Sequence, residues 1–199
     1  MADSRKNAKS KRNAPKENGK RTEVEAKMSV KVNGREVEHP VRKFLMAVGM
    51  ILLPLVGGST IALLTINAQE AFSSFKQPVL APPAWLFPVM WTILYIMMGV
   101  ASYLIYRSRL NDTVNKKLWV SELILFYVQL VFNYVWSLLF FNADLKFFAF
   151  GWLVTMWLMS VALVVLCWRN CRAAMWLLLP YPLWCTFAGY LNIAIAMLN

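Results

Sequence analysis

The sequence predicts an all-α integral membrane protein: a bundle of five transmembrane helices that follows a disordered basic tail. Of the 199 residues, 59% are hydrophobic and only 16% are charged, an apolar share above that of ordinary soluble domains. The charges also gather at one end, because residues 1–43 hold 13 of the 21 Lys and Arg residues. The remaining chain has too few charges to cover a soluble surface, so we expect lipid to be its solvent.

The predicted tail, residues 1–43, is rich in Lys, Arg, Asn and Glu and has almost no aromatic residues. Such a segment cannot bury enough apolar surface to fold. Two interpretations stay open: a solvated topology anchor, which we favour, and a segment attracted to anionic lipid or another polyanion. A secretory signal peptide fits poorly, because the following apolar run exceeds the roughly 7–15 residues of its hydrophobic region.

Five charge-poor runs follow, each longer than the about 20 residues that cross the hydrocarbon core as a helix. They span residues 44–66, 85–106, 118–141, 147–168 and 173–198. Backbone groups find no partners in lipid, so each run is expected to be helical. Glu122 is the only charged residue within the runs, and it lies one turn from the start of the third.

In the first two helices, small residues and aromatic residues indicate which faces turn inward. Trp91 and Tyr95 are four residues apart and therefore share a face of the second helix. Trp85 fits an interfacial aromatic belt, whereas Trp91 lies deeper, where its indole N–H needs a partner. Small residues and a proline allow close backbone approach in the first helix: Pro54, Gly57, Gly58 and Ala62.

The third helix carries a polar stripe in which Gln129, Asn133 and Ser137 recur every four residues. Amides in hydrocarbon must find partners, so the stripe is expected to face the bundle interior. We favour hydrogen bonds between helices as its role. The alternative is that Asn133 also presents its amide to a ligand.

The fifth helix repeats this pattern, because Trp184, Ala188 and Asn192 lie at four-residue intervals. On such a helix face, the large tryptophan ring can form the wall of a cavity, and the small alanine leaves space beside it. Together, these helical faces predict a cavity for a large, flat, mostly apolar ligand with a few polar atoms. Pro180 and Pro182 are expected to bend this helix or delay its start.

Neither a catalytic set nor a metal site is expected. The apolar runs contain no histidine, no paired carboxylates and no Ser/His/Asp supply. Cys167 and Cys171 could share a helix face, but the only histidine, His39, lies far away in the sequence. We therefore predict that these two cysteines and Cys185 are buried free thiols.

Three stretches, together with "PLVGG" in the first helix, carry a family resemblance: "PPAWLFPVMWTILYIMMGVASY", "QLVFNYVWSLLFF" and "LPYPLWCTFAGYLN". In order and spacing they resemble the TspO/MBR family of tryptophan-rich sensory proteins, also known as translocator proteins or peripheral-type benzodiazepine receptors. The resemblance covers residues 44–199. It implies a five-helix bundle, often a homodimer, that binds porphyrins such as protoporphyrin IX or haem and, in some members, sterols and synthetic ligands.

Carried over by this resemblance, the ligand site comprises Trp91, Tyr95, Asn133, Trp184 and Ala188. We add four supporting residues from the patterns above: Gln129, Ser137, Asn192 and Gly57. Three departures matter. Ala71, Phe72 and Leu80 stand where the family commonly has two tryptophans and a tyrosine; the end of the fifth helix lacks the animal sterol motif; and the basic tail lies outside the resemblance.

From these observations we expect a protein of the lipid bilayer that binds porphyrins for sensing, sequestration or transport. The alternatives are light-dependent porphyrin breakdown by the pocket tryptophans and a purely structural scaffold. No cofactor and no nucleic acid partner is expected. Five spans would place 19 of the 21 Lys and Arg residues on one side, which predicts a cytoplasmic N-terminus. We favour a bacterial cell membrane over an organellar one.

Overall fold

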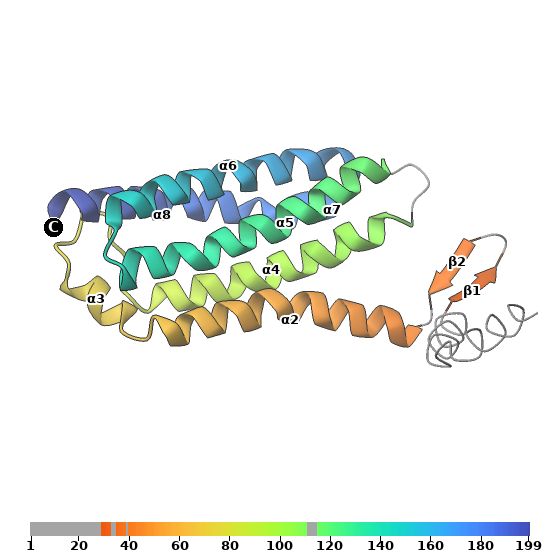
Figure 1. The fold of residues 1–199 in the computed structure, drawn as a ribbon, viewed down its shortest axis with the longest axis horizontal. Coiled ribbons are helices and arrows are strands. Elements are labelled where there is room, and N and C mark those ends of the chain that lie inside the picture. Colours follow the sequence, from red (N-terminus) through yellow and green to blue (C-terminus); the bar gives the residue numbers. More distant parts are fainter. Residues whose placement is uncertain (1–28, 33–34, 39, 111–114) are drawn as a thin grey trace, which may run out of the picture. The chain divides into compact units, whose positions relative to one another are not determined.

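The computed structural model describes residues 29–32, 35–38, 40–110 and 115–199. The chain divides into two compact units, Met1–Met46 and Ala47–Asn199, and each is described by itself. Figure 1 follows the chain through its strands and helices.

The first unit contains a β-hairpin in a region expected to be disordered. Strands β1 (Ser29–Val32) and β2 (Arg35–Glu38) pair antiparallel, with Ser29 opposite Glu38 and Val32 opposite Arg35. An Asn-Gly dipeptide separates the strands in the sequence, a pair typical of two-residue hairpin loops. The expectation of disorder is based on the composition of residues 1–43, and composition does not detect such a local turn signal. Residues 1–28 of the predicted tail lie outside the described residues.

The second unit is a helical bundle, which confirms the predicted fold class. Its elements are α2 (Pro40–Leu64, which starts in the first unit), α3 (Ala68–Ser74), α4 (Leu86–Ser108), α5 (Lys116–Ser137), the π-helix η1 (Leu138–Asn142), α6 (Lys146–Asn170), α7 (Arg172–Leu178) and α8 (Pro180–Leu198). Among the described residues, five spans are long and apolar enough to cross a membrane: Pro40–Leu64, Leu86–Ser108, Lys116–Asn142, Lys146–Asn170 and Arg172–Leu198. The first begins four residues before the predicted run.

Local sequence explains several helix ends. The Asn115 side chain accepts hydrogen bonds from the backbone N–H groups of Lys117 and Leu118, at 3.0 and 3.4 Å, and so caps the start of α5. The fifth span is interrupted where α7 gives way to α8 at Pro180. This confirms the predicted effect of proline on the last helix.

In Figure 1, α4, α5, α6 and α8 run alongside one another, and α3 lies at the end of the bundle where the chain ends. Helix α5 packs on α6, α6 packs on α8, and α4 packs on α7. The buried core between them is largely aliphatic and aromatic. In contrast, Pro54 and Gly58 are the buried residues of α2, so this helix covers the bundle without entering its core.

Helix α2 approaches the bundle through glycines, as expected. A side chain at Gly57 would collide with the Tyr134 ring, and one at Gly58 would collide with the Tyr95 ring. On α4, a Cβ atom at Gly99 would lie 2.7 Å from the backbone Cα of Ile51. The contact of α2 with α4 and α5 therefore requires that these three positions lack side chains.

We predict that Gly99→Ala lowers the free energy of unfolding by about 1–3 kcal/mol, the usual effect of overpacking. The added methyl group would meet backbone atoms of Ile51, which cannot move aside as a side chain would. Reversible unfolding in detergent measures the change. Gly151→Ala is the matched control, because nothing lies within 4 Å of a Cβ atom there. Equal stability of the two variants would contradict the close packing of α2 on α4.

Candidate functional site

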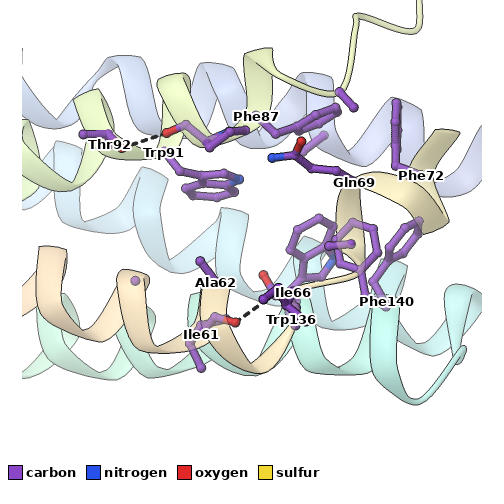
Figure 2. Close-up of a pocket in the computed structure, with 18 of the residues that line it drawn as sticks. Ile61, Ala62, Ile66, Gln69, Phe72, Phe87, Trp91, Thr92, Trp136 and Phe140 are labelled. Carbon is purple, nitrogen blue, oxygen red and sulfur yellow. Dashed lines mark hydrogen bonds between the residues drawn. The ribbon is translucent and has the colours of Figure 1, made fainter.

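A cavity of about 240 Å³ lies between α2, α3, α4, α8 and the junction of α5 with η1. Figure 2 shows Trp91 entering it from α4, with Ala62 on α2, Ile66 in the turn between α2 and α3, Gln69 and Phe72 on α3, and Trp136 and Phe140 at the α5 end. Most of the wall is apolar and much of it is aromatic. Such a surface suits a flat, mostly apolar molecule.

The cavity is closed on the bundle side and open toward α2. Trp136, Phe140 and Ala188 form buried parts of the wall. The exposed wall residues come from α2, the turn that follows it, α3 and α4, and Ile66 in that turn has 73% of its surface exposed. A ligand could therefore reach the cavity beside α2.

Trp91 lies at the centre of a group of aromatic rings. Its ring stacks on Tyr95 with centroids 5.6 Å apart, and the rings of Tyr181 and Trp136 follow at 6.4 and 6.5 Å. The described residues provide no hydrogen-bond acceptor for its indole N–H, whereas the indoles of Trp119 and Trp136 each have one. Trp91 therefore offers an unpaired donor to a molecule in the cavity.

Asn133 supports this aromatic group through hydrogen bonds to two of its tyrosines. The Tyr95 hydroxyl donates to the Asn133 amide oxygen at 2.6 Å, and the Asn133 amide nitrogen donates to the Tyr181 hydroxyl at 3.1 Å. Asn133 is only 1% exposed and does not line the cavity. In this structure its amide joins α4, α5 and α8, the role that we favoured from the sequence.

Asn192 plays the corresponding part on α8, but at the cavity wall. The Trp136 indole N–H donates to its amide oxygen at 3.1 Å, and its amide nitrogen donates to the backbone carbonyl of Lys146 at 2.8 Å. Both hydrogen-bonding groups of the Asn192 side chain are used within the protein. Asn192 therefore fixes the orientation of the Trp136 ring.

The structure brings together some of the sequence-predicted site residues at the cavity and leaves others outside it. The cavity is lined by Trp91, Tyr95, Ala188, Ser137 and Asn192. The positions that do not line it are Asn133, Trp184, Gln129 and Gly57. Trp184 is buried behind the wall and contacts the ring of Phe87, whose centroid lies 6.0 Å away.

Sequence reasoning missed several wall residues. Trp136 follows Asn133 by three residues and precedes Phe140 by four, so a helical period could have placed both rings on the inner face. Phe72, noted as a departure from the family pattern, is buried and contacts Phe87, with ring centroids 4.7 Å apart. An aromatic ring thus covers the cavity from α3.

The three cysteines are free thiols, with Cys167 and Cys185 buried and Cys171 partly buried. The described part of the chain contains no group of three His, Cys, Asp or Glu residues placed to hold a metal ion. His39 lies outside that part.

The model of the TspO/MBR family matches residues 50–198. The chain is 34% identical over 155 residues to "Tryptophan-rich protein TspO" of Chlorobaculum tepidum, covering 77% of this chain and 94% of that protein. It is 33% identical to "Protein CrtK" of Rhodobacter capsulatus, covering 64% and 78% of the two chains. It is also 33% identical to "Translocator protein" of Bos taurus, covering 73% and 85%.

We predict that Asn133→Leu lowers the free energy of unfolding by about 1–3 kcal/mol, because it leaves buried hydroxyl groups without partners. Reversible unfolding in detergent measures this. Gln129→Leu is the matched control, since Gln129 lies on the same helix and neither of its amide atoms has a partner among the described residues. We expect Gln129→Leu to leave the free energy of unfolding unchanged. If both variants lost equal stability, the Tyr95–Asn133–Tyr181 contact would not be a specific support.

Proposed function

The chain belongs to the TspO/MBR family, and from this premise we propose that it binds porphyrins or related tetrapyrroles in the cavity beside Trp91. Binding would serve sensing, sequestration or transport of these molecules. The ligand is a flat, conjugated ring with few polar atoms, which is the chemistry that the wall favours.

The observation that carries this proposal is the position of Trp91. Its indole ring projects into the cavity (Figure 2) and its N–H has no acceptor among the described residues. A tetrapyrrole can stack on the ring, and a carboxylate on its edge can accept the N–H hydrogen bond.

The size of the cavity also bears on how a ligand would lie. Its volume of about 240 Å³ is just below the roughly 300–1,000 Å³ of drug-sized sites. A macrocycle larger than the cavity would therefore have one edge in the opening beside α2. The small residues Ser59 and Ala62 line the cavity on that helix, and both are exposed. We propose that the ring enters edge-on past these positions.

The charge distribution supports an orientation for the whole protein. Arg107, Arg109, Lys116 and Lys117 flank the junction of α4 with α5, and Arg169 and Arg172 flank that of α6 with α7. We propose that this basic end is cytoplasmic, by the positive-inside rule. The cavity would then open in the other half of the membrane, near α3 and Asn199. Relatives occur in both bacteria and eukaryotes; we favour the bacterial cell membrane for this chain.

We predict that Trp91→Ala weakens protoporphyrin IX binding by about 2 kcal/mol or more, as at other aromatic hot spots. Trp91→Phe, which keeps a ring but loses the donor, should cost about 1 kcal/mol. Fluorescence titration measures both, with samples equilibrated in the dark and excited only briefly to limit any light-dependent breakdown of the ligand. Trp176→Ala is the matched control, because Trp176 is 63% exposed and lies away from the cavity wall. Parent-like binding by a folded Trp91→Ala variant would contradict the proposed site.

We also predict that reporters fused to the two ends of the chain lie on opposite sides of the membrane, with the N-terminal reporter in the cytoplasm. Five spans place the two ends apart, and the basic residues select the side. An alkaline phosphatase fusion after Asn199 and a fluorescent protein fusion before Met1 distinguish the outcomes in bacterial cells. A cytoplasmic C-terminus would refute the proposed topology.

A further inference from the structure

The cavity has a roof that comes from outside the long helices. Residues 65–77, here called the roof segment, comprise α3 and its flanking turns. They contribute Thr65, Ile66, Ala68, Gln69 and Phe72 to the cavity lining. Because all of the remaining wall except Ala84 belongs to membrane spans packed in the bundle, this segment is the part that could open with the least disturbance.

The side-chain amides of Asn142 and Asn199 hold the backbone near both ends of the roof segment. The Asn142 side chain donates to the backbone carbonyl of Leu64 at 3.0 Å. The backbone N–H of Lys76 donates to the Asn199 side-chain oxygen at 2.8 Å, and the Asn199 amide donates back to the Lys76 carbonyl at 3.3 Å. These bonds fix where the segment begins and ends. They do not hold the side chains that cover the cavity.

A cation–aromatic contact acts between these two anchors. The Lys146 ammonium lies 4.7 Å from the centroid of the Phe75 ring. The same ring meets Phe140, a cavity-wall residue, edge-on with centroids 6.1 Å apart. The lysine side chain is only 13% exposed and also pairs with Asp144. A partly desolvated cation over a ring is favourable by about 0.5–2 kcal/mol.

The place of Lys146 in the fold is unusual for a lysine. It is the first residue of α6, where the helix dipole disfavours a positive charge. The same residue supplies the backbone carbonyl that receives the Asn192 amide, and Asn192 in turn holds Trp136 in the wall. Lys146 therefore contacts the roof segment through Phe75 and the cavity wall through Asn192.

We propose that Lys146 is a positioning residue whose ammonium latches the roof segment over the cavity and so limits the rates of ligand uptake and release. The effect on ligand rests on the proposed function, whereas the latch itself concerns the protein without ligand. Release of Phe75 would free α3 to move while its two ends stay anchored.

Hydrogen–deuterium exchange of the full chain in lipid nanodiscs tests the latch without any ligand. Lys146→Met keeps the length of the side chain and removes the charge. It should raise exchange in residues 68–77 by about 2- to 30-fold, the factor that corresponds to about 0.5–2 kcal/mol. Lys146→Arg, which keeps a cation over the ring, should stay within about twofold of the parent. Unchanged exchange in Lys146→Met would overturn the proposal.

Lys76→Met is the matched control. It removes a positive charge from the roof segment itself but leaves the Asn199 bonds, which Lys76 makes through its backbone. Exchange should not change in this variant. An increase equal to that of Lys146→Met would show that any lost charge loosens the segment, and would overturn the latch.

Stopped-flow fluorescence with protoporphyrin IX then tests the consequence for the ligand. If Lys146 acts by holding the roof closed, Lys146→Met should raise the association and dissociation rates by a similar factor and leave Kd nearly unchanged. Slower association would instead mean that the ammonium attracts the anionic ligand, and would overturn the latch as the cause. If the parent protein bound no protoporphyrin IX, the proposed function would fail, and the exchange experiment would still decide on the latch.

Discussion

The hydrogen-bonded contact of Tyr95, Asn133 and Tyr181 determines the geometry of the bundle centre. Lipid offers no partner to an amide, so Asn133 must use both its donor and its acceptor within the protein. It does so with hydroxyl groups from two other helices, at 2.6 and 3.1 Å. This fixes the ring of Tyr95, and Trp91 stacks on that ring. The position of the main cavity residue thus depends on an amide that lies outside the cavity.

The cavity itself results from the way in which Trp91 and α2 contact Tyr95. One face meets Trp91, and the ring edge meets α2 at Gly58, where a side chain would not fit. Helix α2 approaches the bundle closely at its glycines. Farther along the same helix, Ala62 is too small to fill the space opposite Trp91. The gap is therefore encoded by small residues on α2 rather than by a missing element of the bundle.

Apolar run lengths and helical spacing were sufficient to predict the five spans and the inward positions of Trp91, Tyr95, Ala188 and Asn192. Spacing could not predict depth. Trp184 shares a helix face with Ala188 by its four-residue interval, yet it lies behind Phe87, because the position along a helix is set by packing against distant segments. Likewise, Asn133 faces inward as expected. Spacing could not decide between its two possible roles; in the structure its amide forms hydrogen bonds with Tyr95 and Tyr181. The hairpin at 29–38 escaped prediction because composition averages over the Asn-Gly signal.

The side chains of the cavity wall and those of the roof segment are held by different kinds of interaction. The wall depends on amide hydrogen bonds inside the membrane, where losing a partner is costly and substitutions at Asn133 or Asn192 disturb several helices at once. The ends of the roof segment are held by the Asn142 and Asn199 amides. Its aromatic side chains are held by aromatic and cation–aromatic contacts, as between Phe75 and Lys146, which tolerate changes of ring type. This chain departs from the family pattern at Ala71 and Phe72, both in the roof segment. The cavity lining can therefore change at the roof segment while the bundle that supports Trp91 stays intact, as expected when a rigid scaffold carries a variable loop.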